Sequence, residues 1–446
     1  MTSKILLLLL LLSGQCFGQA PLTLQQAINR AWANRKNIQS GKSDVAIRRL
    51  QTEALYKKYW PQVSLEYVFQ YNPILQTSIL PIGEFNPAYP PDAYKNIQFG
   101  TRWSQTAGLT LTQPLLDVST RKQIHEFEMQ EKITAASQAQ SEYELAYTVA
   151  QAYINISLQE KQILSAAADT VRTWISYQLQ QDKFDNKRLL KSDLNKAHIN
   201  HNNAIQKYKD AISQLVENKV YLLFLIGDSN IDKADVVTDT LILNDYMAKS
   251  MELKAPVDSI PELQQLDYQA RLPVLQEQSE KAKYQPTLNL KGYLGADQYT
   301  GTFNPLNGGS WFGYSYVGLD LKYPILFGED KHRKIQQLQL QALQFSQQRE
   351  DKSAQYLKDA VTAKIKMDRV HAQLTTDKEN IALSMETIQI MQDRLAEGQE
   401  SASSLNTEEA NLQGIEAEYE TGKMQLWVYW LDYLKASGQL GLLWKK

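Results

Sequence analysis

The chain has 446 residues, a formal net charge of -2 and a mean hydropathy of -0.43. A charge this close to zero excludes the basic footprint of a nucleic-acid-binding protein and leaves no acidic tail. Only 14 prolines and 20 glycines occur, and charged, Gln and Ala residues dominate long stretches. The composition therefore favours long solvated helices over one compact core.

Residues 1–18 have the pattern of a secretory signal peptide. Lys4 precedes a short apolar run, and the small residues Cys16 and Gly18 follow it. We expect cleavage after Gly18. Lipidation of Cys16 is the alternative, which the large residue Gln15 before it disfavours. No later apolar run reaches the length of a membrane-spanning helix, so we expect an exported chain without one.

Two helices are predicted before the first strand. The first begins near Leu22, with Thr23 as its N-cap, and continues through Trp32. The second spans about Lys42 to Tyr59, and Pro61 stops it.

The segment from Pro61 to Tyr71 alternates apolar and polar residues, which is the period of a strand. A similar segment returns about 225 residues later, from Pro286 to Leu294. Residues 72–104 are rich in turn-forming residues and are predicted to form a long loop. A strand through Ala107 and Leu111 follows, and Pro114 is expected to end it.

Residues 118–186 contain no proline or glycine and are predicted to form one helix, with Val149, Ile156 and Ile163 at heptad spacing along a coiled-coil seam. A turn near 184–188 leads to a helix that ends at Gly227. Residues 331–397 repeat this plan, with a turn at Gly398 and a helix that returns to Gly438. Pro114 and Gly227 are 113 residues apart, and Pro324 and Gly438 are 114 apart. This near-equality predicts an internal twofold repeat.

These patterns predict nine segments in chain order. They are a signal peptide (1–18), first-repeat N-terminal helices (19–60), β-hairpin 1 (61–114), a long helical hairpin (115–227), an equatorial linker (228–261), second-repeat upper helices (262–285), β-hairpin 2 (286–324), a second long helical hairpin with its tip near 397–401 (325–438) and a C-terminal tail (439–446).

Four strands of about ten residues cannot close a barrel alone, so several chains must contribute to one barrel. The strand length suits a tilted membrane span. An ordinary soluble β-sandwich is the alternative, but it has no use for two helices of about 70 residues. The strand period assigns Val63, Leu65, Tyr67, Phe69, Leu288 and Leu290 to a lipid-facing side, and Glu66, Gln70, Asn289 and Lys291 to a pore-facing side.

The order and spacing of several motifs resemble the TolC-like outer-membrane efflux proteins. They include Leu22 to Ala27, Gln113 to Asp117, Tyr323 to Gly328 and the two helical tips. The resemblance covers essentially the whole mature chain. It implies an α+β membrane protein: a homotrimer with a 12-stranded β-barrel in the outer membrane, four strands from each chain, continuous with a long α-helical coiled-coil barrel in the periplasm.

The resemblance also implies function and partners. The family forms a passive exit duct of tripartite efflux or type I secretion systems, gated at its periplasmic tips. Its partners are a periplasmic adaptor (membrane fusion) protein, an inner-membrane pump of RND, ABC or MFS type, and outer-membrane lipid.

The family's tip glycine corresponds to Gly398 and, in the first repeat, to Lys187. Its Thr-Asp after the first tip corresponds to Ser192-Asp193. The adaptor-docking tips would be Asn186, Lys187, Arg188, Glu397 and Gly398, and the periplasmic aperture Ser192, Asp193, Glu400, Ser404 and Thr407.

The acidic ring of some family members falls on Ser404 and Thr407 and is therefore missing. Glu400, Glu408 and Glu409 lie nearby in sequence and are the candidates for supplying negative charge at the aperture instead. His198 and His201 have a metal-ligand spacing, but without a third ligand a solvated helix face is the preferred interpretation. The sequence contains no phosphate loop, nucleophile elbow or zinc helix, so we expect no enzyme activity, cofactor or metal and no nucleic-acid partner. The alternatives are a periplasmic adaptor-like coiled-coil protein, which has fewer hairpins, and a secreted enzyme.

Overall fold

The computed structural model describes residues 22–228, 259–303, 311–325 and 330–444. The signal peptide and nearly all of the linker at 228–261 lie outside these ranges. The chain divides into two compact units. The helical unit contains Met1–Val45, Ile133–Asp267 and Phe345–Lys446, and the sheet unit contains Ala46–Lys132 and Tyr268–Gln344.

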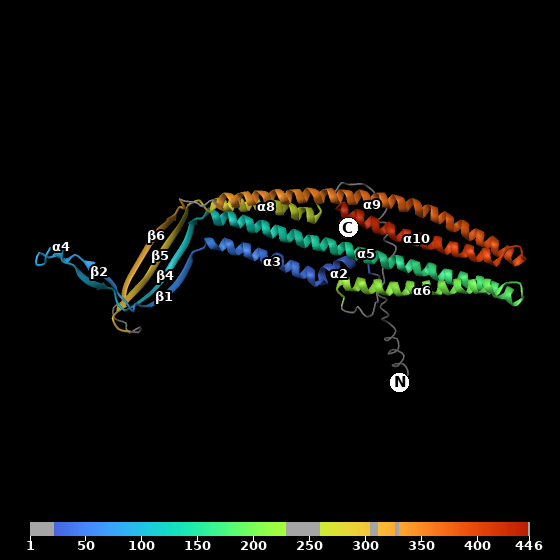
Figure 1. Ribbon diagram of the computed structural model, residues 1–446, viewed down its shortest axis with the longest axis horizontal. Coiled ribbons are helices and arrows are strands. Elements are labelled where there is room, and N and C mark those ends of the chain that lie inside the picture. The colour runs from blue at the N-terminus through green and yellow to red at the C-terminus, as the bar shows by residue number, and fades with distance from the viewer. Residues whose placement is uncertain (1–21, 229–258, 304–310, 326–329, 445–446) are drawn as a thin grey trace, which may run out of the picture. The chain divides into compact units, whose positions relative to one another are not determined.

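The main sheet has four antiparallel strands in the order β1-β4-β5-β6 (Figure 1). They are β1 (Gln62–Tyr71), β4 (Trp103–Leu116), β5 (Thr287–Thr300) and β6 (Trp311–Lys322). Strands at all four places were predicted and are confirmed. β1 and β6 each have one strand neighbour among the described residues and so form the two edges of the sheet.

The prediction that Pro114 ends its strand is wrong. β4 continues to Leu116, with an irregularity in its pairing with β5 between Pro114 and Leu116. On its other side β4 pairs with β1 only as far as Thr112. Pro114 therefore occupies a strand edge beside a bulge, where a missing N–H leaves no ladder bond unmade.

Residues 72–104 are not only a loop, as predicted, but also contain a second antiparallel sheet. β2 (Gln76–Leu80) pairs with β3 (Lys95–Phe99), and the short helix α4 (Ile82–Phe85) lies between them in the chain. The pairing aligns Gln76 with Phe99 and Leu80 with Lys95. The local turn signals were recognised, but short strands between prolines carry too little periodicity to be identified.

The predicted long helices are confirmed. α5 (Val118–Asp185) and α9 (Asp330–Glu397) have 68 residues each, and α6 (Lys191–Ile226) and α10 (Ala402–Ala436) have 36 and 35. α8 spans Pro261–Ala282, and a 3-10 turn at Leu440–Leu443 follows α10. No helix among the described residues combines the length and apolarity needed to cross a membrane.

The first N-terminal helix begins after the predicted N-cap, and the second begins earlier than predicted. α2 (Leu24–Asn34) has Thr23 as N-cap, and Gln26 completes a capping box. α3 spans Lys36–Tyr56 and passes into a 3-10 turn at Lys57–Tyr59, whereas the prediction started it at Lys42. Ile38 is fully buried in the core of the helical unit, but one apolar residue among residues 36–41 gives too weak a periodic signal to place the start of a helix.

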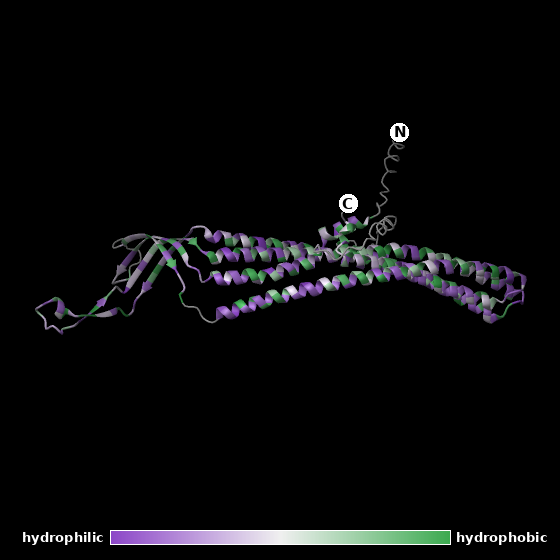
Figure 2. Cartoon of the chain, turned by 90° about the horizontal axis from the view of Figure 1, so that it is seen from above, coloured by the Kyte–Doolittle hydropathy of each residue, from purple (hydrophilic) through white to green (hydrophobic). Residues whose placement is uncertain are grey.

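The core of the helical unit gathers apolar residues from α2, α5, α6, α9 and α10. Val149 and Ile156 of the predicted seam are fully buried, and so are their neighbours Tyr153 and Ile154. The Tyr153 hydroxyl donates to the Leu22 carbonyl at 2.8 Å, which fixes the start of α2. In Figure 2 hydrophobic and hydrophilic residues intersperse along every long helix, as expected for helices that are covered on some faces only.

Candidate functional site

The sheet register sorts the strand residues into two faces. Val63 is opposite Leu111, which is opposite Gly292, which is opposite Val317, so these four share one face. Glu66, Gly108, Gly295 and Tyr314 form a row on the other face. The six residues predicted to face lipid therefore share the first face, and the four predicted to face the pore share the second.

The first face is apolar and uncharged. Its side chains are largely exposed within one chain, for example Leu65 at 77% and Val317 at 81%. The polar side chains on it include Gln105 and Gln298, which are buried and joined by a 3.0 Å hydrogen bond. Tyr67 also donates to Gln105, at 2.5 Å. These bonds pair the polar groups with one another, which an apolar surrounding requires.

The second face carries the charges of the sheet. Lys291 pairs with Asp320 at 2.7 Å, and Thr106 donates to Asp297 at 2.7 Å. Glu66 and Gln70 are exposed on it. One sheet thus has an uncharged apolar side and a charged side that carries the polar groups expected beside water.

The two turns between long helices have the same backbone geometry. Lys187 has φ 60° and Gly398 has φ 76°, both left-handed. Arg188 donates its backbone N–H to the Lys183 carbonyl, and Gln399 donates to the Arg394 carbonyl, each at 2.8 Å. This pattern is a helix C-cap of the Schellman type. The sequence alignment of Lys187 with Gly398 therefore corresponds to one shared conformation.

All five residues predicted as adaptor-docking tips are exposed. Beneath them a small apolar cluster includes Leu395, Leu405 and Leu412, with Leu179 and Leu189 packed against it. Gln180 and Asn406 exchange two side-chain hydrogen bonds at 2.7 and 3.1 Å, which join α5 to α10. The cluster and this amide pair bring the two turns together.

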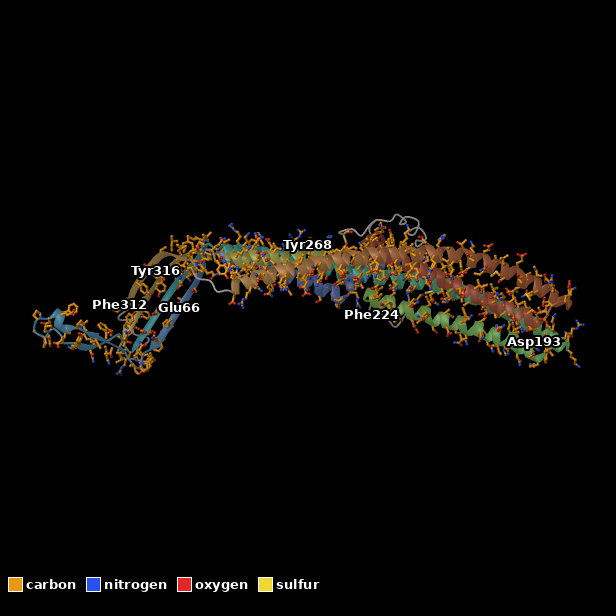
Figure 3. All side chains as sticks on the ribbon, turned by 45° about the horizontal axis from the view of Figure 1, so that its top comes forward. Glu66, Asp193, Phe224, Tyr268, Phe312 and Tyr316 are labelled. Atoms are coloured by element: carbon orange, nitrogen blue, oxygen red, sulfur yellow. The ribbon has the colours of Figure 1, made fainter. Side chains whose placement is uncertain are left out.

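The residues predicted for the aperture have local contacts. Asp193 is half-buried near the beginning of α6 and pairs with Lys196 at 3.6 Å (Figure 3). Ser401 caps α10, accepting from the Ser404 N–H at 3.1 Å. Glu400 accepts from the Ser401 N–H at 2.9 Å, and its hydrogen bonds to Ser401 and then Ser404 lower the pKa of its carboxyl. Ser192 and Thr407 are exposed.

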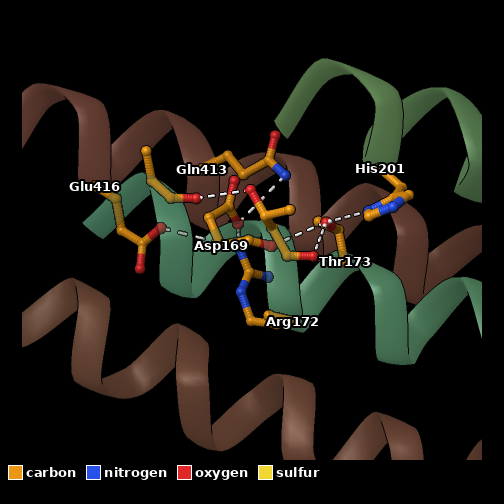
Figure 4. A network of polar contacts seen from close by, with 8 residues as sticks. Asp169, Arg172, Thr173, His201, Gln413 and Glu416 are labelled. Atoms are coloured by element: carbon orange, nitrogen blue, oxygen red, sulfur yellow. Dashed lines mark hydrogen bonds and ion pairs between the residues drawn. The ribbon is translucent and has the colours of Figure 1, made fainter. Parts of the chain in front are cut away.

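A polar network that the sequence did not reveal joins α5, α6 and α10 (Figure 4). Arg172 pairs with Asp169 one turn away and with Glu416 of α10 at 3.8 Å. Gln413 of α10 donates to Asp169 at 3.5 Å. The i,i+3 pair of Asp169 and Arg172 is visible in the sequence, but its partners on α10 are more than 200 residues away and carry no local signal.

Glu409 lies on the buried side of α10. Its side chain is 1% exposed, and burial raises the pKa of its carboxyl, opposed by a hydrogen bond from Ser176 and by the charge of Arg172. Burial also raises the pKa of Glu416. Glu408 accepts from Ser384 at 3.0 Å. The suggestion that Glu409 adds exposed negative charge at the aperture is therefore wrong, because helix packing turns it towards α5.

The interpretation of His198 and His201 as one solvated face is also wrong in part. His201 is buried, and its Nδ1 lies 3.2 Å from the Thr173 hydroxyl of α5. His198 is exposed and stacks on Tyr177 at 4.9 Å. Among the described residues no group of His, Cys, Asp and Glu side chains could hold a metal ion.

No protein-family model and no curated protein matches the sequence. Solved structures do match. CusC, whose structures concern folding and transmembrane channel formation, has a TM-score of 0.76 at 14% identity over 93% of this chain and 91% of its own. The Vibrio cholerae outer membrane protein VceC has a TM-score of 0.73 at 12% identity over 93% and 96%.

The open state of the Neisseria gonorrhoeae MtrE outer membrane channel has a TM-score of 0.67 at 14% identity over 93% of this chain and 88% of its own. The chain has the TolC-like outer-membrane channel fold. At these identities the likeness concerns the fold, and the sheet faces and helical turns above supply the residues on which a function can be argued.

Proposed function

We propose that this protein is an outer-membrane channel, the passive exit duct of a tripartite efflux or type I secretion system. The observation that carries the proposal is the four-stranded sheet, whose two edges have no partner strand among the described residues and which has an uncharged, exposed apolar face. Unpaired edges cannot remain in a bilayer, so the sheet has to close with sheets of other copies. Three copies give a 12-stranded barrel.

In this barrel the face that includes Leu65 and Val317 meets lipid, and the face with Glu66 and Lys291 lines the pore. Support comes from the charge difference between the two faces and from the paired polar groups on the apolar side. Trp103 stacks with Phe69 and Tyr71 at one end of the strands, a position suited to an aromatic girdle.

We further propose that the helical unit lies in the periplasm and that its turns dock an adaptor protein. An inner-membrane pump of RND, ABC or MFS type would supply energy. The exposed tips Asn186 to Arg188 and Glu397 to Gly398 offer polar groups on rigidly capped turns. Gating would require α9 and α10 to move relative to α5, and the contacts of Arg172, Gln180 and Lys183 with α9 and α10 are the ones that such a movement breaks.

Planar-bilayer recording of the purified protein tests the channel. We expect a small conductance that is closed for most of the time, and complete absence of conductance from a properly assembled oligomer would contradict the proposal.

Two matched charge insertions test the face assignment. Leu65→Arg should impair membrane assembly, because an arginine in the lipid-facing band costs about 2–4 kcal/mol. Gln70→Arg, on the opposite face, should be tolerated. The measurement is the amount of assembled oligomer in the outer-membrane fraction, identified by its dissociation on heating. Equal amounts from both variants would refute the assignment.

A further inference from the structure

The charged face of the sheet exposes more aromatic surface than a water-lined pore requires. Phe312 is 62% exposed, Tyr316 51% and Tyr314 46%. All three lie on β6, on the face that carries Glu66 (Figure 3). Part of each ring stays exposed, although Tyr314 and Tyr316 also contact the ring of Tyr293.

The register arranges these rings in three consecutive rows across the sheet. The first row ends in Tyr293 and Tyr316, the second in Gly295 and Tyr314, and the third in Asp297 and Phe312. Tyr293 stacks with Tyr314 at 4.8 Å and with Tyr316 at 5.8 Å between ring centroids. Tyr293, Tyr314 and Tyr316 therefore form one stacked cluster, and Phe312 lies in the next row of the same face.

Two glycines in the middle row, Gly108 and Gly295, leave room for the neighbouring Tyr293 side chain. A Cβ atom on Gly108 would lie 2.3 Å from the Tyr293 hydroxyl, and one on Gly295 would lie 2.4 Å from it. The Tyr293 side chain therefore packs directly on the backbone of these two glycines, and this packing accounts for an aromatic residue at position 293. It does not explain the exposed rings of Tyr314, Tyr316 and Phe312.

The charged residues around the rings are Lys291, in the row next to Tyr316, its partner Asp320, and the carboxylates Glu66 and Asp297. Glu66 occupies the Gly108 row and Asp297 the Phe312 row. Within the described part of the chain neither carboxylate has a basic side chain within ion-pair distance, whereas Lys291 is paired with Asp320. A bound group would therefore meet aromatic faces and unneutralised negative charge together, which favours a cation that itself carries rings.

Building on the proposed function, we propose that the barrel lumen contains a binding surface for aromatic organic cations. It is formed by Tyr293, Tyr314, Tyr316 and Phe312 beside Glu66 and Asp297. In a trimer the surface is present three times around the pore. It would retain aromatic cations on their way out and slow them relative to anions of the same shape.

Calorimetric titration of the purified, detergent-solubilised oligomer with tetraphenylphosphonium tests the proposal. We expect saturable binding of this cation, and little binding of tetraethylammonium, which lacks rings, or of tetraphenylborate, an anion of the same shape. Tyr314→Leu combined with Tyr316→Leu should weaken binding at least about threefold, and Glu66→Gln about two- to fivefold. Tyr314→Phe combined with Tyr316→Phe keeps the rings and should retain binding.

Matched controls lie outside the main sheet, in α4. Phe85→Leu removes an exposed ring and Glu84→Gln an exposed carboxylate, and neither should change the affinity. If the double Leu variant fails to assemble, the affinities of Glu66→Gln and of the double Phe variant still test the proposal.

Three results would overturn the proposal: no binding of tetraphenylphosphonium to wild type, equal binding of tetraphenylborate, or an unchanged affinity in Glu66→Gln. An oligomer that conducts ions without binding the cation refutes this inference alone, whereas an oligomer that never conducts refutes the proposed function.

Discussion

The two long helical hairpins of this protein have the same lengths but different surroundings. Within the helical unit α5 is buried along most of residues 143–159, where Val149 and Ile156 have no exposed surface. α9 leaves aliphatic residues uncovered at helical spacing, with Leu357 at 48%, Val361 at 44% and Ile365 at 63%. The two stretches thus differ: residues 143–159 of α5 are buried on most sides, whereas α9 buries Tyr356 and Ala360 on one face and leaves on another an aliphatic stripe that the proposed trimer can cover.

The largest effect on stability is expected from matched truncations of a buried residue in α5 and an exposed residue in α9. Ile156→Ala removes a fully buried side chain of α5 and should lower the free energy of unfolding by about 2–5 kcal/mol. Ile365→Ala in α9 should change the stability of the single chain by less than about 0.5 kcal/mol but weaken the oligomer. Thermal unfolding and analytical ultracentrifugation separate the two outcomes, and equal destabilisation of the chain by both variants would contradict the comparison.

The second effect concerns the link between the hairpins. Arg172→Ala removes the cation shared by Asp169 and Glu416, although Asp169 keeps its hydrogen bond from Gln413. A largely buried carboxylate that loses its partner costs about 1–3 kcal/mol. We expect α10 to loosen from α5 and the open fraction in bilayer recordings to rise. Arg49→Ala, which removes an exposed arginine that pairs with Glu53 within α3 at 3.3 Å, is the control and should leave the open fraction unchanged. An open fraction of Arg172→Ala equal to that of wild type would show that the contacts of Arg172 do not keep the channel closed.

The third effect is a pH dependence. Burial raises the pKa of Glu409 above its ordinary value of 4.5, so the folded protein binds this proton more tightly than the unfolded chain does. The resulting stabilisation is complete below pH 4.5 and is lost as the pH rises through the raised pKa. Glu409→Gln should therefore remove this loss, so the variant gains stability relative to wild type as the pH rises. Melting temperatures of both proteins from pH 4 to pH 8 provide the test; parallel curves would exclude the role of Glu409.

The smallest effect compares the two turns. Lys187 adopts a left-handed conformation that costs a side-chain-bearing residue about 1 kcal/mol, whereas Gly398 adopts it without that cost. Lys187→Gly should stabilise the first turn slightly, by up to about 1 kcal/mol, and Gly398→Ala should destabilise the second by a similar amount. Amide hydrogen exchange at the two turns measures both, and a loss of protection in Lys187→Gly would contradict the shared geometry.

Prediction from sequence succeeded where a periodic signal is long. The strand from Gln62 to Tyr71 and the helices without proline or glycine were identified because alternation and heptad spacing repeat over many residues. It failed at Pro114 and in residues 72–104, where the outcome depends on which neighbour a short segment pairs with. The N-cap Thr23 was identified from local residues alone, since its hydrogen bonds join positions three apart.

The sequence by itself determined which residues share a sheet face, because side chains alternate strictly along a strand. It also determined the ends of the helices before Gly227 and Gly398, because glycine marks those points, whereas Lys187 occupies the corresponding position after α5. Only the tertiary structure decided that Glu409 and His201 are buried and that Asp169 and Arg172 meet Gln413 and Glu416. These contacts join residues far apart in the chain, and the rotation of one polar helix against another leaves no periodic trace that distinguishes a buried charge from a solvated one.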